Sequence, residues 1–172
     1  MLVVTEAQRR ELDDNGFTVL ESFFSGDELS ELVAAVAAVP VAPRTQVPQV
    51  FLDLADHPRI LPYVVDLLGW NVQIRDCLFS PVPPRAGTPD RLASAWHFDQ
   101  EEELNGITGD GVLPLIDLKF SYYLSDHTEP GHACTLLVRG SHKWTPGQRS
   151  TWESWLRPEE VVPLREFGCL TS

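Results

Sequence analysis

The sequence predicts an α+β fold in which a jelly-roll sheet packs against helices that come first in the chain. Helix signals fill residues 1–70, whereas short β-prone runs separated by Pro, Gly and Asp dominate residues 71–172. Helices followed by a series of strands are typical of α+β proteins, and many short strands favour a sandwich or jelly roll. A chain of 172 residues is expected to form a single domain.

Three helices are predicted in the first part. Thr5 and Ser25 are each followed three residues later by Gln8 and Glu28, which is the spacing of a capping box. After the second box, apolar residues recur at helical spacing: Leu29, Leu32, Val33 and Val36. A third helix is expected over residues 58–68, because proline suits a first helical turn and glycine often follows a last one. Residues 16–20 are predicted to form a short strand.

Five β-prone runs follow, separated by loops. The runs are residues 71–81, 93–100, 115–126, 133–138 and 160–164. In the third run, side chains should alternate between two faces. Leu118, Phe120, Tyr122 and Leu124 then share an apolar face, while Lys119, Ser121 and Tyr123 share a polar one. The polar face is either a solvated surface or, through the charge of Lys119, a contact for an acidic cosubstrate.

Composition argues against several classes of partner. Lys and Arg number 13 against 25 Asp and Glu, and the net charge is −12. Binding to nucleic acid or to an anionic membrane needs basic residues, so neither is expected. No apolar run reaches the roughly 18 residues that span a bilayer, and the N-terminus lacks the features of a signal peptide. The three cysteines lack CxxC spacing and are expected to be reduced thiols of a cytoplasmic protein.

His97 and Asp99 point to metal chemistry. Two positions apart on an extended strand, they project to the same side and can offer an imidazole and a carboxylate to one ion. Two histidines and one carboxylate on one face of the ion are typical of non-haem Fe(II) oxygenases, which keep open positions for cosubstrate and oxygen. Alternatively, the pair only hydrogen-bonds to its neighbours at the end of a strand. Whether a third ligand exists decides whether the chain is an enzyme.

Three motifs occur in a characteristic order. Residues 14–20 (DNGFTVL) follow the first predicted helix, residues 96–100 (WHFDQ) contain the His–Asp pair, and residues 136–144 (LLVRGSHKW) follow a strand and loop. In this order, the motifs resemble those of the phytanoyl-CoA dioxygenase family of Fe(II)- and 2-oxoglutarate-dependent oxygenases. The resemblance extends from residue 3 to residue 145, with Arg139 in place of the family's usual Pro.

The resemblance implies Fe(II) and 2-oxoglutarate as cofactors, His97 and Asp99 as metal ligands, and hydroxylase-type chemistry on a small organic substrate. It also implies a double-stranded β-helix, the cupin-like jelly roll, and places Arg75 and Ser80 where the family contributes cosubstrate contacts. In the family, the second His ligand and the Arg that binds 2-oxoglutarate come from strands well after the GSHKW segment. No His follows Trp144, so a jelly roll that is incomplete at its C-terminus is expected.

The identity of the third ligand stays open. The local candidates are His132, beside Gly131, and His142 in the GSHKW turn, although the family's His in this turn is a structural residue. If neither serves, the chain is expected to be a catalytically silent jelly-roll module that binds a small molecule or a partner chain. An incomplete sheet exposes the backbone of its edge strand, which favours a homodimer or a strand-completing partner.

Overall fold

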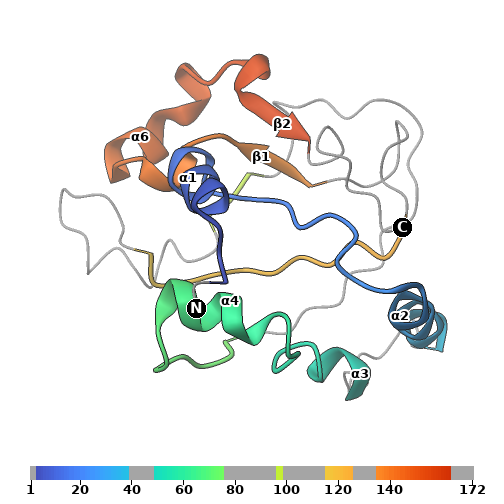
Figure 1. Cartoon of the computed structure of the whole chain (residues 1–172). Coiled ribbons are helices and arrows are strands. Elements are labelled where there is room, and N and C mark those ends of the chain that lie inside the picture. Colours follow the sequence, from blue (N-terminus) through green and yellow to red (C-terminus); the bar gives the residue numbers. More distant parts are fainter. Residues whose placement is uncertain (1–2, 39–48, 76–95, 99–114, 126–134, 164–172) are drawn as a thin grey trace.

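The computed structural model describes residues 3–38, 49–75, 96–98, 115–125 and 135–163. These residues are mostly helical and carry one two-stranded antiparallel sheet. The elements are α1 (Glu6–Asn15), α2 (Gly26–Ala38), α3 (Gln49–Leu52), α4 (Leu61–Leu68), α6 (Pro146–Thr151), β1 (Leu136–Val138) and β2 (Val161–Pro163). In Figure 1, α2, α3 and α4 lie in the lower half, and α1, α6 and the sheet lie in the upper half. The first helix of the chain thus lies among its last described elements.

The first two helices begin at the predicted capping boxes. Before α1, the Gln8 amide donates to the Thr5 hydroxyl at 3.2 Å, and Gln8 Oε1 accepts the Thr5 amide at 2.9 Å. Before α2, the Glu28 amide donates to Ser25 Oγ at 3.3 Å, and Glu28 Oε2 accepts the Ser25 amide at 2.7 Å. Both capping boxes are confirmed, and each satisfies two backbone donors that the start of a helix leaves without partners.

The predicted third helix is α4, which begins later than expected. Residues 57–60 form a separate turn, in which the Ile60 amide donates to the His57 carbonyl at 2.8 Å. Pro62, not Pro58, therefore occupies the first turn of the helix. The helix ends where predicted, at Gly69, whose φ of 85° suits glycine. The short helix α3 was not predicted, because its few residues carry no periodic pattern.

The sheet confirms two of the five predicted strands. β1 and β2 pair antiparallel, with Leu136 opposite Pro163 and Val138 opposite Val161. The chain between them forms α6 and three short 3₁₀ helices, which the sequence analysis did not predict: Ser141–Lys143, Trp152–Ser154 and Pro158–Glu160. A signal for α6 was present, since residues 145–148 (TPGQ) form a capping box with proline at the first helical position.

The other predicted strands are absent from the described residues. Residues 17–20 carry no strand, so the strand expected at 16–20 is wrong. The described parts of three further runs, residues 71–75, 96–98 and 115–125, carry none either. A β-prone sequence forms a strand only where a neighbouring chain accepts its backbone hydrogen bonds. The jelly roll stays a prediction, because much of the region predicted to form it lies outside the described residues.

Two groups of buried apolar residues hold these elements together. The helical cluster has Leu32, Phe51 and Leu54 at its centre, surrounded by Phe24, Ala35, Val36, Val50, Tyr122 and Leu124. The tryptophan cluster has Val138, Leu156 and Val161 at its centre, surrounded by Trp96, Leu136, Trp144 and Trp152. Tyr122 and Leu124 belong to the apolar face predicted for residues 118–124, so this part of the alternation is confirmed.

Asp66 in α4 fixes the N-terminal end of the chain, which lies beside α4 in Figure 1. Its Oδ2 accepts the amides of Val3 and Val4 at 3.0 and 2.9 Å. Its Oδ1 lies 2.7 Å from Arg9 Nη2, which ties α1 to α4. The hydrogen bond from the Val4 amide, followed by that from Arg9, lowers the pKa of Asp66.

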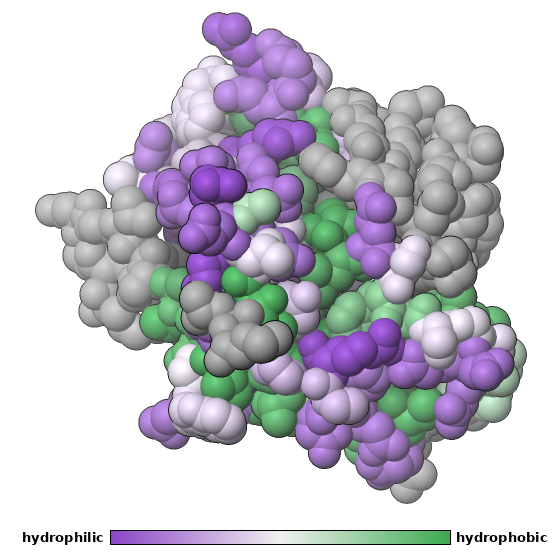
Figure 2. Space-filling model, in the orientation of Figure 1, coloured by the Kyte–Doolittle hydropathy of each residue, from purple (hydrophilic) through white to green (hydrophobic). Residues whose placement is uncertain are grey.

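Figure 2 shows hydrophilic side chains gathered over α1, which buries none of its residues.

Candidate functional site

The described part of the predicted metal motif is held by its two aromatic side chains. Trp96 meets Trp152 edge to face, with ring centroids 6.2 Å apart. Phe98 meets Trp144 in a similar way, with centroids 6.1 Å apart. Both sequence neighbours of His97 thus pack on tryptophan rings, and His97 itself is exposed. This is the alternation of side chains expected along an extended chain.

Arg149 completes the packing around Phe98. Its guanidinium carbon lies 4.6 Å from the centroid of the Phe98 ring, within the range of a cation–π contact. Its Nε donates to the carbonyl oxygen of Trp144 at 3.1 Å. The ring of Trp144 in turn meets that of Trp155, with centroids 4.7 Å apart. Phe98 is therefore held by a cation and a tryptophan that are hydrogen-bonded to each other.

The remaining predicted site residues are only partly described. Asp99, Ser80 and His132 lie outside the described residues. Arg75 and Lys119 are described, and both are exposed. Arg75 follows α4, and Lys119 lies in the connection that carries Tyr122 into the helical cluster. Contact of these two cations with a cosubstrate stays a prediction.

The imidazole of His142 packs on the end of α1 and forms a hydrogen bond there through Nε2. Nε2 lies 2.9 Å from the carbonyl oxygen of Asp13. Because a carbonyl oxygen only accepts, Nε2 carries the hydrogen. Nδ1 is buried, has no hydrogen-bond partner among the described residues, and lies 2.5 Å from where a Cβ on Gly16 would stand. Burial lowers the pKa of His142 and keeps the imidazole neutral, although Asp13 acts in the opposite direction. Nε2 is therefore engaged with Asp13, and Nδ1 lies against Gly16.

The rest of the GSHKW turn also caps α1. The Gly140 amide donates to the Asn15 carbonyl at 2.9 Å, and Arg139 Nη1 donates to Asn15 Oδ1 at 3.2 Å. Lys143 Nζ lies 3.1 Å from Asp13 Oδ1. These contacts satisfy carbonyl oxygens that a helix end leaves without partners and place cations near its negative pole. Two of the motifs that carry the family resemblance are therefore in direct contact, which their order in the sequence did not reveal.

A metal site is not complete within the part of the chain that the structure describes. Among residues 3–38, 49–75, 96–98, 115–125 and 135–163, no three His, Cys, Asp or Glu side chains gather closely enough to hold an ion. His97 is the one described member of the predicted pair. The same described residues contain no helix long and apolar enough to cross a membrane.

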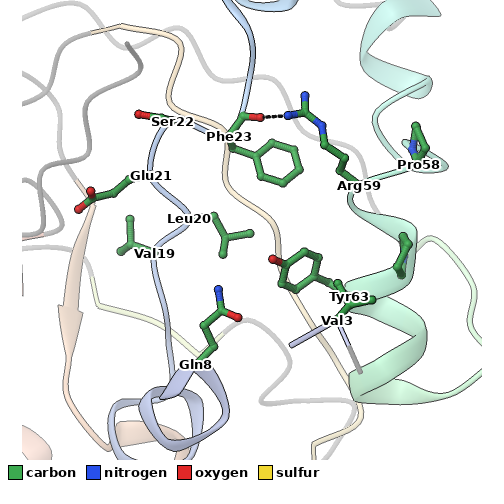
Figure 3. Close-up of a pocket in the computed structure, with 11 residues that line it drawn as sticks. Val3, Gln8, Val19, Leu20, Glu21, Ser22, Phe23, Pro58, Arg59 and Tyr63 are labelled. Carbon is green, nitrogen blue, oxygen red and sulfur yellow. Dashed lines mark hydrogen bonds between the residues drawn. The ribbon is translucent and has the colours of Figure 1, made fainter. Parts of the chain in front are cut away.

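An open cavity of about 600 Å³ lies between α1, α4 and residues 19–23 (Figure 3). Leu20, Tyr63 and Gln8 converge on its middle, whereas Glu21 and Ser22 point away from it. The residues that line it are Val3, Gln8, Val19, Leu20, Glu21, Ser22, Phe23, Pro58, Arg59, Pro62 and Tyr63. None of the predicted site residues is among them. The sequence analysis did not anticipate this cavity, because its walls come from segments far apart in the chain.

One wall of the cavity is fixed by a charged network. Arg59 Nη1 donates to the Phe23 carbonyl (Figure 3), and Arg59 Nη2 lies 2.5 Å from Glu28 Oε2. His57 Nε2 lies 3.4 Å from the other oxygen of Glu28. Hydrogen bonds from the Ser25 amide, then from its hydroxyl and from Arg59, lower the pKa of Glu28 to about 2. The Arg59 guanidinium is thus already paired, which leaves the cavity without a free cation among the described residues that line it.

Comparisons with models of known families, with curated proteins and with solved structures find no match to this chain.

Proposed function

We propose that this chain is an Fe(II)- and 2-oxoglutarate-dependent oxygenase of hydroxylase type, acting on a small organic substrate. The proposal rests on the resemblance to the phytanoyl-CoA dioxygenase family in three motifs. His97 and Asp99 would hold the ion, and Arg75, Ser80 and Lys119 are candidates to bind a carboxylate of the cosubstrate. Charge-assisted hydrogen bonds of this kind are among the stronger polar contacts in proteins.

The observation that carries the proposal is the alternation of side chains at residues 96–98. Trp96 and Phe98 pack on tryptophan rings, while His97 between them is exposed. If the extended course continues by one residue, Asp99 falls on the same side as His97, as a shared ion requires. A neutral imidazole and a carboxylate are ligands that suit Fe(II). Bound iron with 2-oxoglutarate supplies oxygen activation, and the chain's own residues hold and orient the reactants.

The junction at the end of α1 supports the resemblance. Asn15 of the DNGF motif and Asp13 just before that motif supply carbonyl oxygens, and the GSHKW motif supplies the groups that bind them. Each motif thus has a structural reason to occur together with the other. The same junction bears on the third ligand, since His142 binds Asp13 and packs on Gly16. His132, which lies outside the described residues, and His142 both stay candidates for the third ligand.

A second candidate function is a catalytically silent module that binds a small molecule or a partner chain. The engagement of His142 favours it, because releasing this imidazole for a metal would break the cap of α1. A site with two protein ligands lacks the third ligand of the usual set and is expected to hold iron weakly. Each tenfold loss in affinity corresponds to about 1.4 kcal/mol of binding free energy.

Succinate formation from 2-oxoglutarate separates the two functions. The purified chain is supplied with Fe(II), ascorbate and 2-oxoglutarate in air, and succinate is quantified by NMR. We expect slow turnover that is lost in His97→Ala and Asp99→Ala and retained in Asp56→Asn, a control at an exposed carboxylate. Absence of succinate with the wild-type chain would favour the silent module. Turnover that survives both alanine substitutions would contradict the proposed ligands.

A further inference from the structure

We propose that Arg149 and Phe98 are positioning residues for His97, and that the chain between β1 and β2 is the platform that sets the direction of this imidazole. The inference concerns how the metal motif is held, and only the role of His97 as a ligand rests on the proposed function. Sequence patterns alone did not indicate such a platform, because α6 and the 3₁₀ helices after it were not predicted.

The platform is itself well fixed. The Thr145 hydroxyl and the Gln148 side chain form a capping box at the start of α6, which carries Arg149. Leu156 is buried with Val138 and Val161 at the centre of the tryptophan cluster. The chain between the two strands is therefore bound to the sheet at its end and braced by a helix at its middle.

The platform contacts the metal motif at two residues, one on each side of His97. On one side, Trp96 lies against Trp152 with ring centroids 6.2 Å apart. On the other side, Phe98 lies between the Arg149 guanidinium, at 4.6 Å, and the Trp144 ring, at 6.1 Å. A single anchor would leave the segment free to rotate about its long axis.

Two anchors at alternate positions restrict that rotation. Since side chains of an extended chain point to opposite sides in turn, fixing Trp96 and Phe98 also fixes the direction of His97. Residues 96–98 are not assigned to a strand, and the ring contacts of Trp96 and Phe98 contribute to their placement. Arg149 strengthens the second contact by electrostatic attraction, because its guanidinium lies against the face of the Phe98 ring. The guanidinium is held there by the hydrogen bond from Arg149 Nε to the Trp144 carbonyl oxygen. Loss of Arg149 should therefore loosen His97 without unfolding the sheet.

Backbone ¹⁵N relaxation of the full chain tests the inference. In the wild type, His97 should show an order parameter near the value of about 0.85 that is typical of rigid backbone. In Arg149→Gln and Phe98→Leu, it should fall below about 0.6, the range of flexible segments. Phe98→Tyr, which keeps the ring, should retain the wild-type value, and so should Arg10→Gln, a matched control at an exposed arginine of α1. Leu137 in β1 reports whether the sheet stays intact.

Co(II), used as a spectroscopic probe for Fe(II), adds a second readout. Arg149→Gln should weaken Co(II) binding by about tenfold, as is usual for residues that orient metal ligands, while Arg10→Gln should not. If the wild type binds no Co(II) through His97, the proposed function fails, but the order parameters still test the platform. If His97 keeps its order parameter in both Arg149→Gln and Phe98→Leu, the positioning role is overturned whatever the metal does.

Discussion

Gly16 and His142 fit against each other at the end of α1, where a Cβ on residue 16 would stand 2.5 Å from the imidazole Nδ1. Gly16 also has a φ of 86°, in the left-handed region that glycine tolerates best. Two separate requirements therefore favour glycine at this position. Gly140, which precedes the 3₁₀ helix at Ser141–Lys143, meets only one of them. Its φ of 72° lies in the same left-handed region, but the nearest atom to its missing Cβ, the carbonyl oxygen of Asp14, is 3.5 Å away, an ordinary contact.

This difference makes Gly140→Ala a matched control for Gly16→Ala. We expect Gly140→Ala to lower the free energy of unfolding by about 1–2 kcal/mol, the cost of a left-handed backbone with a side chain. Gly16→Ala should cost about 1–3 kcal/mol more, because the new methyl group also overpacks against His142. Urea unfolding of both variants measures the difference. Equal losses would show that the imidazole gives way freely and that the junction is loose.

The neutral state of His142 should make stability depend on pH. Burial lowers its pKa from 6.5 in the folded chain, so the unfolded chain takes up the proton first as pH falls. The contribution of His142 is therefore complete above about pH 6.5 and decreases as pH falls toward the lowered value. His142→Gln keeps a donor for Asp13 and does not titrate. The wild type should lose stability relative to His142→Gln between pH 7 and pH 5, as followed by urea midpoints, and parallel curves would contradict the assignment.

The helix caps were predictable from the sequence because they are local. Thr5 with Gln8 and Ser25 with Glu28 need only a fixed spacing, and the structure forms both boxes. The strands were less predictable, since a strand needs a partner that may lie far away in the chain. Residues 17–20 have a β-prone composition, yet no described segment pairs with them.

For the candidate site, the sequence named residues that could bind an ion, but it did not indicate the contacts around them. The His–x–Asp spacing indicated which residues could share an ion, and the packing of Trp96 and Phe98 agrees with an extended course there. The contacts that place these residues join distant segments, such as Phe98 to Arg149 and Gly16 to His142. Such contacts follow from tertiary packing and leave no short-range pattern.

The network around Glu28 should stabilise the fold through its charge. Its pKa is lowered to about 2, so its contribution is present above its ordinary value of 4.5 and is lost as pH falls toward 2. Glu28→Gln keeps a side chain able to cap α2 and removes the charge that pairs with Arg59. We expect a lower melting temperature than the wild type at pH 7, with the difference vanishing near pH 2. Glu31→Gln, at an exposed position of the same helix, should show no such convergence.

Two neighbouring residues of the apolar stripe predicted for α2, Leu32 and Val33, differ in exposure. Leu32 is 3% exposed and lies at the centre of the helical cluster, whereas its neighbour Val33 is 43% exposed. Leu32→Ala should lower the free energy of unfolding by about 2–5 kcal/mol, the usual cost of truncating a buried leucine. Val33→Ala should change it by less than about 0.5 kcal/mol. Similar losses in chemical denaturation would contradict the packing of this helix.

Anaerobic calorimetric titration with Fe(II) tests the central claim, that His97 and Asp99 bind one ion together. We predict binding to the wild-type chain that disappears in His97→Ala and in Asp99→Ala. Asp56→Asn, an exposed carboxylate elsewhere, should bind as the wild type does. Equal loss in the two alanine variants indicates a shared ion, because either ligand alone holds Fe(II) poorly. Binding that is unchanged in both alanine variants would contradict the claim.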